Sequence, residues 1–286
     1  MPICVTDVTY TYQPGTPFAA TALRGVNLTI SEGEFLGLIG HTGSGKSTLI
    51  QHFNGLLRPT EGQVLVDGVD TANRNNRKAI RQKVGLVFQY PEHQLFEETV
   101  AKDVAFGPRN LALSEAEIEE RVQEALTMVG LDPAKYAPRS PFDLSGGEMR
   151  RVAIAGVLAM NPSYLILDEP TAGLDPRGRN EILGHVARLH KELGLTVVLV
   201  SHSMEDVARL VDRLVIMHRG QVAADGKPRE LFGEPERLKE LGLGIPQVTE
   251  LMRRIAAKYP GVRPDVLTVK EAAAELLRYL GRQADA

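Results

Sequence analysis

The residues best suited to chemistry lie between Gly40 and Ser47, where the sequence reads GHTGSGKS. The string fits the pattern G-x-x-x-x-G-K-[ST] and stands between an apolar, strand-like run and a helical run. Glycines in such a turn let backbone N–H groups converge on phosphate oxygens, toward which the next helix points its positive end. Lys46 can reach the β- and γ-phosphates of a nucleotide, and the Ser47 hydroxyl can bind Mg²⁺. We therefore predict a nucleotide site formed by Gly40, His41, Thr42, Gly43, Ser44, Gly45, Lys46, Ser47 and Thr48.

Two adjacent carboxylates follow the apolar run in YLILDEP, which begins at Tyr164. Ligands of α/β sheets bind at the carboxyl ends of the strands. Asp168 suits the metal side of the site and can hold Mg²⁺ directly or through water. Glu169 suits a general base that polarises an attacking water. Alone the pair would be an ordinary acidic strand end, but beside a phosphate loop it predicts nucleotide hydrolysis.

Strand-like and helical runs alternate around these motifs, which is typical of a mainly parallel sheet covered on both faces and so of the α/β class. Strands are predicted at Ile3–Thr11, Gly25–Ile30, Glu34–Ile39, Val64–Val66, Val84–Phe88, Tyr164–Leu167, Thr196–Val200 and Leu214–Met217. Helices are predicted at Lys46–Asn54, Gly147–Met160 and Pro176–Leu193.

Two regions are helical without intervening strands. Between Pro91 and Leu144 the periodicity predicts an inserted helical subdomain with helices at Thr99–Phe106 and Glu115–Val129. Ser114 and Glu117 fit a capping box for the second of these helices. Residues 236–286 are expected to form a small C-terminal appendage of amphipathic helices at Val248–Lys258 and Thr268–Arg282, with a capping box at Thr268 and Glu271.

The composition narrows the class of protein. The chain has 286 residues with 33 Lys and Arg against 36 Asp and Glu, and this net charge of −3 argues against a general nucleic-acid binder. A single cysteine, Cys4, allows no intrachain disulfide and fits a reducing compartment. No signal peptide is apparent, and no apolar run approaches the about 20 residues of a membrane helix. We therefore expect a chain that does not span a bilayer.

The string LSGGE at Leu144–Glu148 resembles the signature motif of ABC-type ATPases, which reads LSGGQ. The likeness extends over about residues 3–232, with the family landmarks in order. It implies a P-loop, RecA-like core with an antiparallel β subdomain and a helical subdomain at about residues 91–160. These parts would make up a nucleotide-binding domain of residues 1–235 that uses ATP and Mg²⁺.

The resemblance also implies roles for single residues. Gln89, after a predicted strand, is similar to the Q-loop glutamine that senses the nucleotide and its metal. Asp175 stands in AGLD, which is similar to the D-loop, and His202 is similar to the switch histidine that contacts the γ-phosphate. Tyr12 resembles the aromatic residue that stacks on adenine, with Tyr10 as the alternative.

The signature motif predicts a second molecule. A serine and glycines at a helix start make an anion site, and the chain's own phosphate loop already holds phosphate. In the family, two chains sandwich ATP so that each signature faces the partner's phosphate loop; here the motif residues are Ser145, Gly146, Gly147 and Glu148. Glu148 departs from the family's glutamine. Its charge near a phosphate predicts a tuned rate, and it fits a helix-start carboxylate equally well.

Further strings, among them QYPEHQLF, SPFD and RRVAIAG, resemble the ATPases of energy-coupling factor (ECF) transporters of the A-prime type. This resemblance implies an importer of vitamins or metal ions at the cytoplasmic face of the cell membrane, to which the chain binds peripherally. Its partners would be a second ABC ATPase, a membrane T component and a substrate-binding S component. The surface Gln89–Glu98 is expected to dock the T component, with Glu92, Glu97 and Glu98 receiving its basic residues.

Three other classes of protein share parts of this pattern. The ABC heads of chromosome-maintenance and repair machines carry a long coiled coil between the phosphate loop and the signature. In this sequence the segment between the two motifs is too short for such a coiled coil and has no sustained heptad pattern. A P-loop kinase or GTPase would leave the signature and His202 unexplained. The ATPase of another ABC importer, for amino acids, metals or phosphate, would share all of this chemistry and stays open. No nucleic-acid partner is expected.

Overall fold

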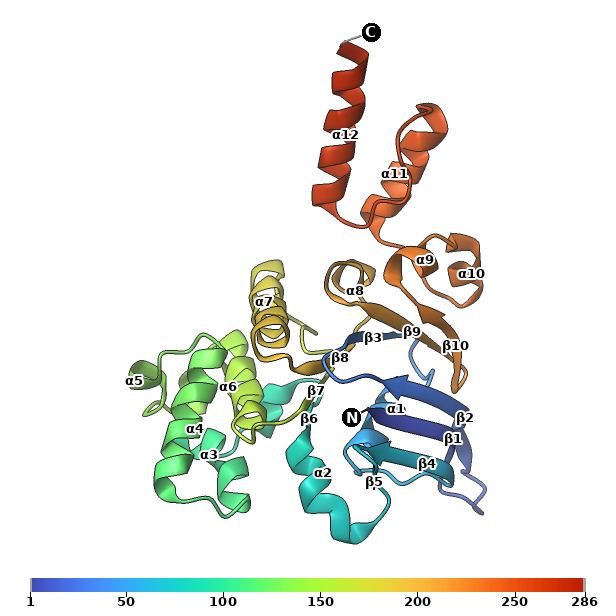
Figure 1. Cartoon of the computed structure of the whole chain (residues 1–286). Helices are drawn as coiled ribbons and strands as arrows, with labels where there is room; N and C mark the ends of the chain where they lie inside the picture. Colours follow the sequence, from blue (N-terminus) through green and yellow to red (C-terminus); the bar gives the residue numbers. More distant parts are fainter. Residues whose placement is uncertain (1, 285–286) are drawn as a thin grey trace.

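The structure is a computed structural model that describes residues 2–284 (Figure 1). Its strands form two sheets. The four-stranded antiparallel sheet has the order β2-β1-β4-β5. Its strands are β1 (Ile3–Tyr12), β2 (Ala20–Ile30), β4 (Glu61–Val66) and β5 (Val69–Asp70). This is the antiparallel β subdomain that the ABC resemblance implied.

The six-stranded sheet has the order β10-β9-β3-β8-β7-β6 and is parallel except for β10. Its strands are β3 (Phe35–Ile39), β6 (Val84–Val87), β7 (Tyr164–Asp168), β8 (Thr196–Val200), β9 (Arg213–His218) and β10 (Gln221–Gly226). Every residue of β3, β7 and β8 is buried, as expected for strands covered on both faces. The prediction of a mainly parallel sheet is confirmed.

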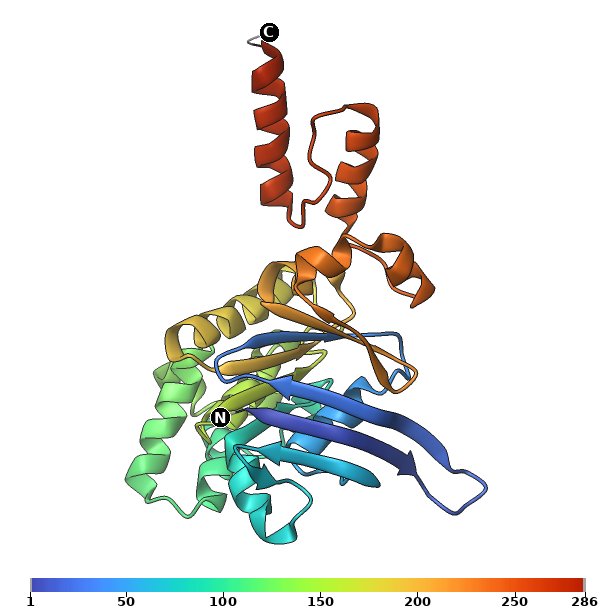
Figure 2. The same cartoon turned by 45° about the vertical axis from the view of Figure 1, so that its right-hand side comes forward.

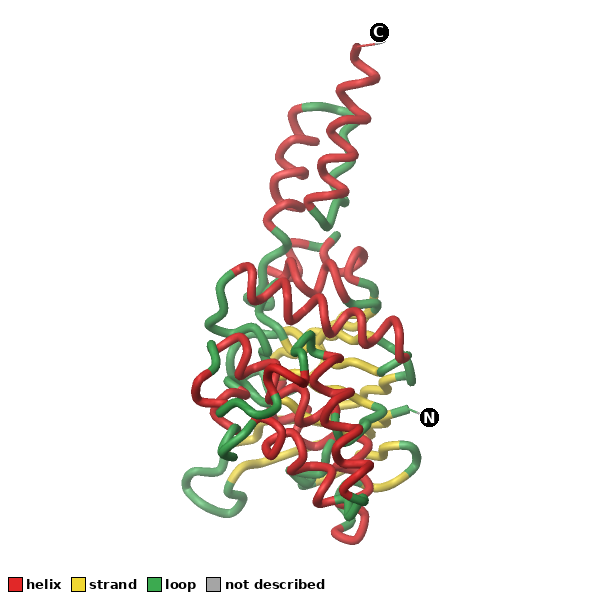
Figure 3. Tube along the Cα trace, turned by 90° about the vertical axis from the view of Figure 1, so that its left-hand side faces the viewer, coloured by secondary structure: helices red, strands yellow, loops and turns green. Residues whose placement is uncertain are grey.

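The helices complete the layers. They are α1 (Lys46–Phe53), α2 (Arg77–Lys83), α3 (Val100–Asn110), α4 (Glu115–Met128), α5 (Pro133–Tyr136), α6 (Gly146–Leu158), α7 (Pro176–Leu193), α8 (Met204–Leu210), α9 (Pro228–Phe232), α10 (Pro235–Glu240), α11 (Gln247–Lys258) and α12 (Val269–Ala284), with 3₁₀ helices η1 (Arg74–Asn76), η2 (Pro91–Gln94) and η3 (Pro141–Asp143). In Figure 3, helices lie in front of the strands on the side of the helical subdomain. Among residues 2–284, no helix combines the length and hydrophobicity needed to cross a bilayer.

Two hydrophobic cores lie on opposite faces of the larger sheet. On one face, Leu38 and Val198 pack with α1 and the smaller sheet. On the other face, Phe35 and Val197 share a core with α6, α7 and the helical subdomain. Alternate residues of each strand pack into different cores, so the sheet is packed on both faces. This packing holds the carboxyl ends of the strands in fixed positions.

The helical subdomain and the C-terminal helices lie at different places on this core. Helices α3, α4 and α6 pack together on one side, and the predicted capping box of Ser114 and Glu117 is present at the start of α4 (Figure 1). The hairpin of α11 and α12 projects from the end opposite α2 (Figures 1 and 2). The capping box expected at Thr268 forms only in part. Glu271 N donates to Thr268 Oγ1 (3.2 Å), but the Glu271 carboxylate accepts from Leu267 N. The domain limits at residues 235 and 236 stay a prediction.

Candidate functional site

The glycine-rich loop between β3 and α1 packs so closely against neighbouring backbone that no side chain can be accommodated at two of its turns. Gly40 has φ +153°, and a Cβ there would lie 2.3 Å from Met217 O. Gly45, at φ +103°, would place a Cβ 2.7 Å from Ala22 O. The loop is therefore pressed against neighbouring backbone, which fixes its course and requires glycine at these two positions.

Lys46 closes this loop from the first turn of α1. The residue is only 5% exposed, and its Nζ donates to Gly40 O (2.7 Å) and His41 O (3.2 Å). Burial lowers the pKa of Lys46, while the carboxylates of Glu169 and Asp168 oppose that effect. The ammonium therefore lies inside the loop and close to both carboxylates that end β7.

Asp168 offers an oxygen suited to a metal ion. It is 6% exposed, and its carboxylate accepts a hydrogen bond from Ser47. Its Oδ1 is buried without a hydrogen-bond partner among the described residues. Burial raises the pKa of Asp168, and such an uncompensated buried oxygen gains from a nearby cation. A carboxylate beside a serine hydroxyl is the kind of oxygen donor set that Mg²⁺ prefers, so the residues present fit this ion.

Glu169 is held between two side chains that reach it from neighbouring strands. His202 Nε2 lies 2.7 Å from Glu169 Oε1, and Gln89 Nε2 donates to Glu169 Oε2 at 3.1 Å. The three residues follow β6, β7 and β8, which are adjacent in the sheet. Glu169 itself has φ +49°, a conformation that costs a non-glycine residue energy and that clusters at functional sites. The structure thus brings together the three residues predicted to be catalytic, Gln89, Glu169 and His202.

The two candidate adenine-stacking residues differ in exposure. Tyr12 is 40% exposed and its hydroxyl lies 3.1 Å from Thr48 Oγ1. Tyr10 packs edge-on against both Tyr12 (4.8 Å between centroids) and the buried ring of His52 (4.9 Å), and it contacts the core. Of the two, Tyr12 is the more exposed ring and Tyr10 packs against it, which favours Tyr12 as the stacking residue.

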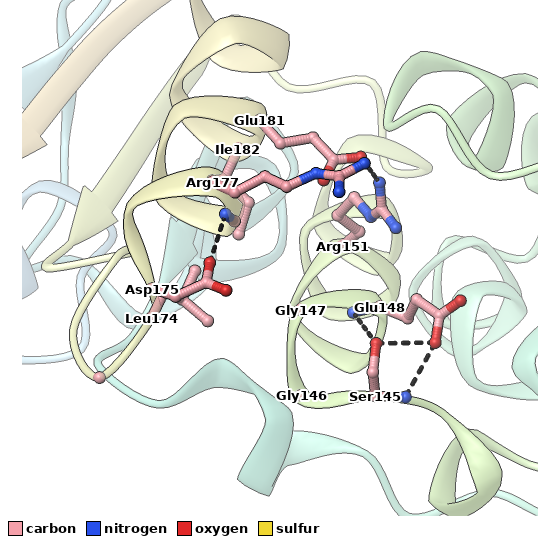
Figure 4. A pocket seen from close by; sticks show the side chains of 12 residues that line it. Ser145, Gly146, Gly147, Glu148, Arg151, Leu174, Asp175, Arg177, Glu181 and Ile182 are labelled. Atoms are coloured by element: carbon pink, nitrogen blue, oxygen red, sulfur yellow. Dashed lines mark hydrogen bonds and ion pairs between the residues drawn. The ribbon is translucent and has the colours of Figure 1, made fainter.

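The signature motif lies at a second place, across a cavity of about 400 Å³ (Figure 4). Its lining comes from the start of α6 and from the turn that leads into α7, where Asp175 accepts from Gly178 N (2.7 Å) as the N-cap. A Cβ at Gly146 or Gly147 would meet nothing within 4 Å. The chain's own packing does not require glycine at these positions, whereas the close approach of a ligand or partner would.

Glu148 completes a capping box at the start of α6. Ser145 N and Ser145 Oγ both donate to Glu148 Oε2 (2.8 Å each), as dashed lines show in Figure 4. Glu148 Oε1 accepts from the hydroxyl of Tyr136 at 2.7 Å. The Tyr136 hydroxyl and the Ser145 donors lower the pKa of Glu148 from 4.5 to about 2. The carboxylate is therefore ionised and tied to Ser145, as the helix-start interpretation expected.

With this geometry established, the chain was compared with known proteins. Residues 23–172 match the ABC transporter family. Relatives include the energy-coupling factor transporter ATP-binding proteins EcfA2 of Clostridium tetani (54% identical over 285 residues, 99% of each chain) and of Symbiobacterium thermophilum (59% over 277 residues, 96% of each). This chain belongs to the ABC transporter ATPase family. Within the family it groups with the ECF ATP-binding proteins.

Solved structures agree with this assignment of the ABC ATPase. CbiO1 of Clostridium perfringens, described as part of the ABC transporter complex CbiONQ, matches with a TM-score of 0.75 at 39% identity, covering 90% of this chain and 97% of that one. A dimeric ATP-binding cassette in a post-hydrolysis state, bound to ADP and Pi, matches with a TM-score of 0.70 at 35% identity, covering 79% and 98%. The predicted fold class is thereby confirmed.

One residue of this ABC ATPase that sequence reasoning missed is Arg150, which is 1% exposed on α6. Its Nη1 donates to Pro170 O (2.9 Å) and Ala172 O (2.8 Å), in the turn that follows Glu169. Its Nε and Nη2 donate to the Glu92 carboxylate (3.1 and 2.8 Å). The sequence contained a signal for this role, because an arginine pair stands on the apolar side of the signature helix. The acceptors of Arg150 could not be predicted, because they lie far away in the sequence.

The same contact corrects the expected docking surface of the ABC ATPase. Glu92 was expected to receive basic residues of a membrane partner, yet Arg150 already occupies its carboxylate. Burial works to raise the pKa of Glu92, but the hydrogen bonds from Arg150 outweigh it and lower the pKa. Glu98 pairs with Lys102 at the surface. Of the three glutamates, Glu97 alone keeps a carboxylate without an ion pair among the described residues.

Proposed function

We propose that this chain binds ATP with Mg²⁺, pairs with a second ABC ATPase around the nucleotide, and hydrolyses it to drive an ECF importer of vitamins or transition-metal ions. The observation that carries the proposal is the contact of Gln89, Glu169 and His202 at the ends of three adjacent strands. This group of side chains stands beside a phosphate loop whose lysine is already inside it.

Each side chain has a distinct task in this proposal. Lys46 and the loop amides bind the β- and γ-phosphates, and Tyr12 stacks on the base. Ser47 and Asp168 hold Mg²⁺, which would neutralise phosphate charge. The Gln89 amide nitrogen donates to Glu169, so its amide oxygen is the atom able to bind the metal.

Hydrolysis depends on Glu169, which orients and deprotonates the attacking water in this proposal. A hydrogen bond from Gln89 and the 2.7 Å contact with His202 Nε2 fix the direction of its carboxylate. When ATP is bound, His202 contacts the γ-phosphate and Gln89 follows the helical subdomain. The Glu169 carboxylate therefore becomes able to bind the attacking water only when bound nucleotide has moved Gln89 and His202 away from it.

The signature acts in trans in this proposal. Its cavity is lined by residues 145–182 and by none of residues 40–48. Ser145, Gly146, Gly147 and Glu148 would therefore face the γ-phosphate on the partner ATPase, with Asp175 at the junction. The free space beyond both glycines supports such an approach.

Membrane partners complete the machine. We infer that a T component docks near Gln89–Glu98, with Glu97 as the free acidic contact, and that a separate S component selects the substrate at the cytoplasmic face of the membrane. The ATPase of a different ABC importer is the second candidate, because its chemistry would be the same. The relatives that span 96–99% of the chain favour the ECF type.

The experiment is Glu169→Gln in the assembled complex. We expect ATP binding to persist while hydrolysis falls about 10²–10⁴-fold, because amide nitrogen cannot accept a proton from water. Glu119→Gln, on the exposed face of α4, is the matched control and should hydrolyse ATP normally. Near-wild-type turnover by the Glu169 variant would remove the base from the proposal.

A further inference from the structure

Four arginines converge on the surface around α2. Arg74 belongs to η1, while Arg77 and Arg81 belong to α2. Arg58 joins them from the loop between α1 and β4. Arg74, Arg77 and Arg81 follow one another at spacings of three and four residues, which places them on one face of η1 and α2. The positive charges of Arg58, Arg74 and Arg81 all act on Arg77. We call this set the arginine cluster.

The chain itself does not neutralise the arginine cluster. The sequence has no Asp or Glu from Thr71 through Pro91. No ion pair or side-chain hydrogen bond joins the four guanidinium groups to any other described residue, and Arg58 Nε, Arg58 Nη2 and Arg77 Nε are buried donors without acceptors. Burial lowers the pKa of Arg77, and the other three arginines lower it further. Gathering like charges costs stability, so the cluster needs an external anion to offset it.

The arginine cluster also has a defined place in the molecule. Helix α2 lies at the end opposite the C-terminal helices α11 and α12 (Figures 1 and 2). It leads directly into β6, whose far end carries Gln89 and the surface expected to dock the membrane partner. The cluster thus lies just before β6 and the expected docking surface just after it, so a four-residue strand separates them.

We propose that the arginine cluster binds the phosphate groups of anionic phospholipids at the membrane surface. The planar fork of each guanidinium matches phosphate oxygens in a bidentate manner and is weakly hydrated, so arginine suits this contact better than lysine. The inference rests on the proposed membrane location and adds a direct lipid contact to it. The ATPase chemistry does not depend on that contact.

An acidic protein segment is the competing occupant, and the surface argues against it. Protein interfaces centre on buried aromatic or aliphatic anchors. Among residues 57–89, all of which the structure describes, no large hydrophobic side chain is exposed, while Leu56, two residues before Arg58, is 44% exposed. A charged surface with a single exposed leucine beside it fits a layer of lipid headgroups, where each arginine or lysine contributes independently.

The test measures co-flotation of the full chain with vesicles at about 0.1 M salt, where the Debye length is about 10 Å. We expect the partition onto vesicles containing phosphatidylglycerol to exceed that onto pure phosphatidylcholine by on the order of several hundred-fold, because each of the four arginines contributes about 1 kcal/mol. Neutralising each arginine should lower the partition about fivefold, so Arg58→Gln, Arg74→Gln, Arg77→Gln and Arg81→Gln together should reduce binding to the phosphatidylcholine level.

The matched control removes the same charge from the opposite end of the molecule, through Arg253→Gln, Arg254→Gln, Lys258→Gln and Lys270→Gln, and should keep its binding. Retained ATPase activity shows that either quadruple variant is folded and separates this test from the proposed function. The inference is overturned if wild type does not prefer anionic vesicles, or if both quadruple variants bind alike. It is also overturned if vesicle binding survives in the cluster variant while assembly with the T component is lost.

Discussion

At the scale of single residues, Glu148 has the most informative surroundings. Its carboxylate joins the signature serine to Tyr136 of the helical subdomain, and its pKa is lowered to about 2. A group whose pKa is depressed on folding adds stability above its unfolded value of 4.5, and this stability is lost as the pH falls from there toward 2. Because the group is only partly buried, solvent screening keeps the effect small.

Tyr136→Phe tests this contact. Removal of the hydrogen bond from the Tyr136 hydroxyl to Glu148 should lower the free energy of unfolding by about 1 kcal/mol at pH 7. The deficit should shrink as the pH falls from 4.5 toward 2, because the unfolded chain takes up a proton there while Glu148 of the folded wild type stays ionised until about pH 2. The substitution should also raise the KM for ATP, because Ser145 is less well held. Urea denaturation at each pH measures the first effect. Tyr259→Phe, on the exposed end of α11, is the control; equal losses in both variants would contradict the assignment.

Residue identities at the site could be predicted from the sequence, because Gln89, Glu169 and His202 each follow an apolar strand. Parallel strands end at one edge of a sheet, so the motifs had to meet. The sequence could not show that Glu169 contacts both Gln89 and His202. It also could not show that the backbone of Glu169 is left-handed, since the φ of this residue depends on the turn that follows it. The choice between Tyr10 and Tyr12 also needed their burial.

At the scale of elements, Arg150 joins three segments through one buried side chain. It connects α6 with η2 and with the turn after β7. Arg150→Met should destabilise the chain by about 3–5 kcal/mol, since Glu92 and two carbonyls lose their donor. Arg150→Lys should not rescue it, because one ammonium cannot span the three acceptors. Urea unfolding of both variants checks this.

The double variant Arg150→Met with Glu92→Leu provides the control for charge. If the loss comes from an unpaired buried carboxylate, the double variant should recover part of it. A loss below about 1 kcal/mol in Arg150→Met alone would show that the three segments hold together without this side chain.

Elements with strong periodicity could be predicted closely: Pro176–Leu193 and Thr196–Val200 have the predicted ends. Helix α2 was missed because seven residues hold little periodicity and its single buried residue is Ile80. Strand β10 was missed because it is an edge strand with small residues and partial burial. Its place is set by pairing with β9, which is a tertiary effect.

At the scale of the whole molecule, association of this chain with a second ABC ATPase should depend on the surface formed by the signature glycines. Gly147→Asp should leave the unfolding temperature nearly unchanged, because a Cβ there meets nothing within 4 Å. It should abolish ATP-dependent association and lower hydrolysis on the order of 100-fold by placing a negative charge against the partner's phosphate. Size-exclusion chromatography with ATP, alone and with the companion ATPase, measures the association.

Gly184→Asp is the matched control for that variant, since Gly184 also lies on an exposed helix surface with open space at its Cβ. It should associate and hydrolyse ATP as wild type does. Equal behaviour of the two variants would place the dimer contact elsewhere on the molecule.

The separation of phosphate loop and signature within one chain has a consequence for a pair of unlike subunits. The Glu148 of this chain would influence the nucleotide that its companion holds, whereas its Glu169 would cleave the nucleotide held here. Two chains with different signatures would therefore run their two reactions at unequal speeds. Exchanging glutamate for glutamine at position 148 would change the rate of hydrolysis of the nucleotide bound by the companion subunit. The rate at the nucleotide bound by this chain would stay the same.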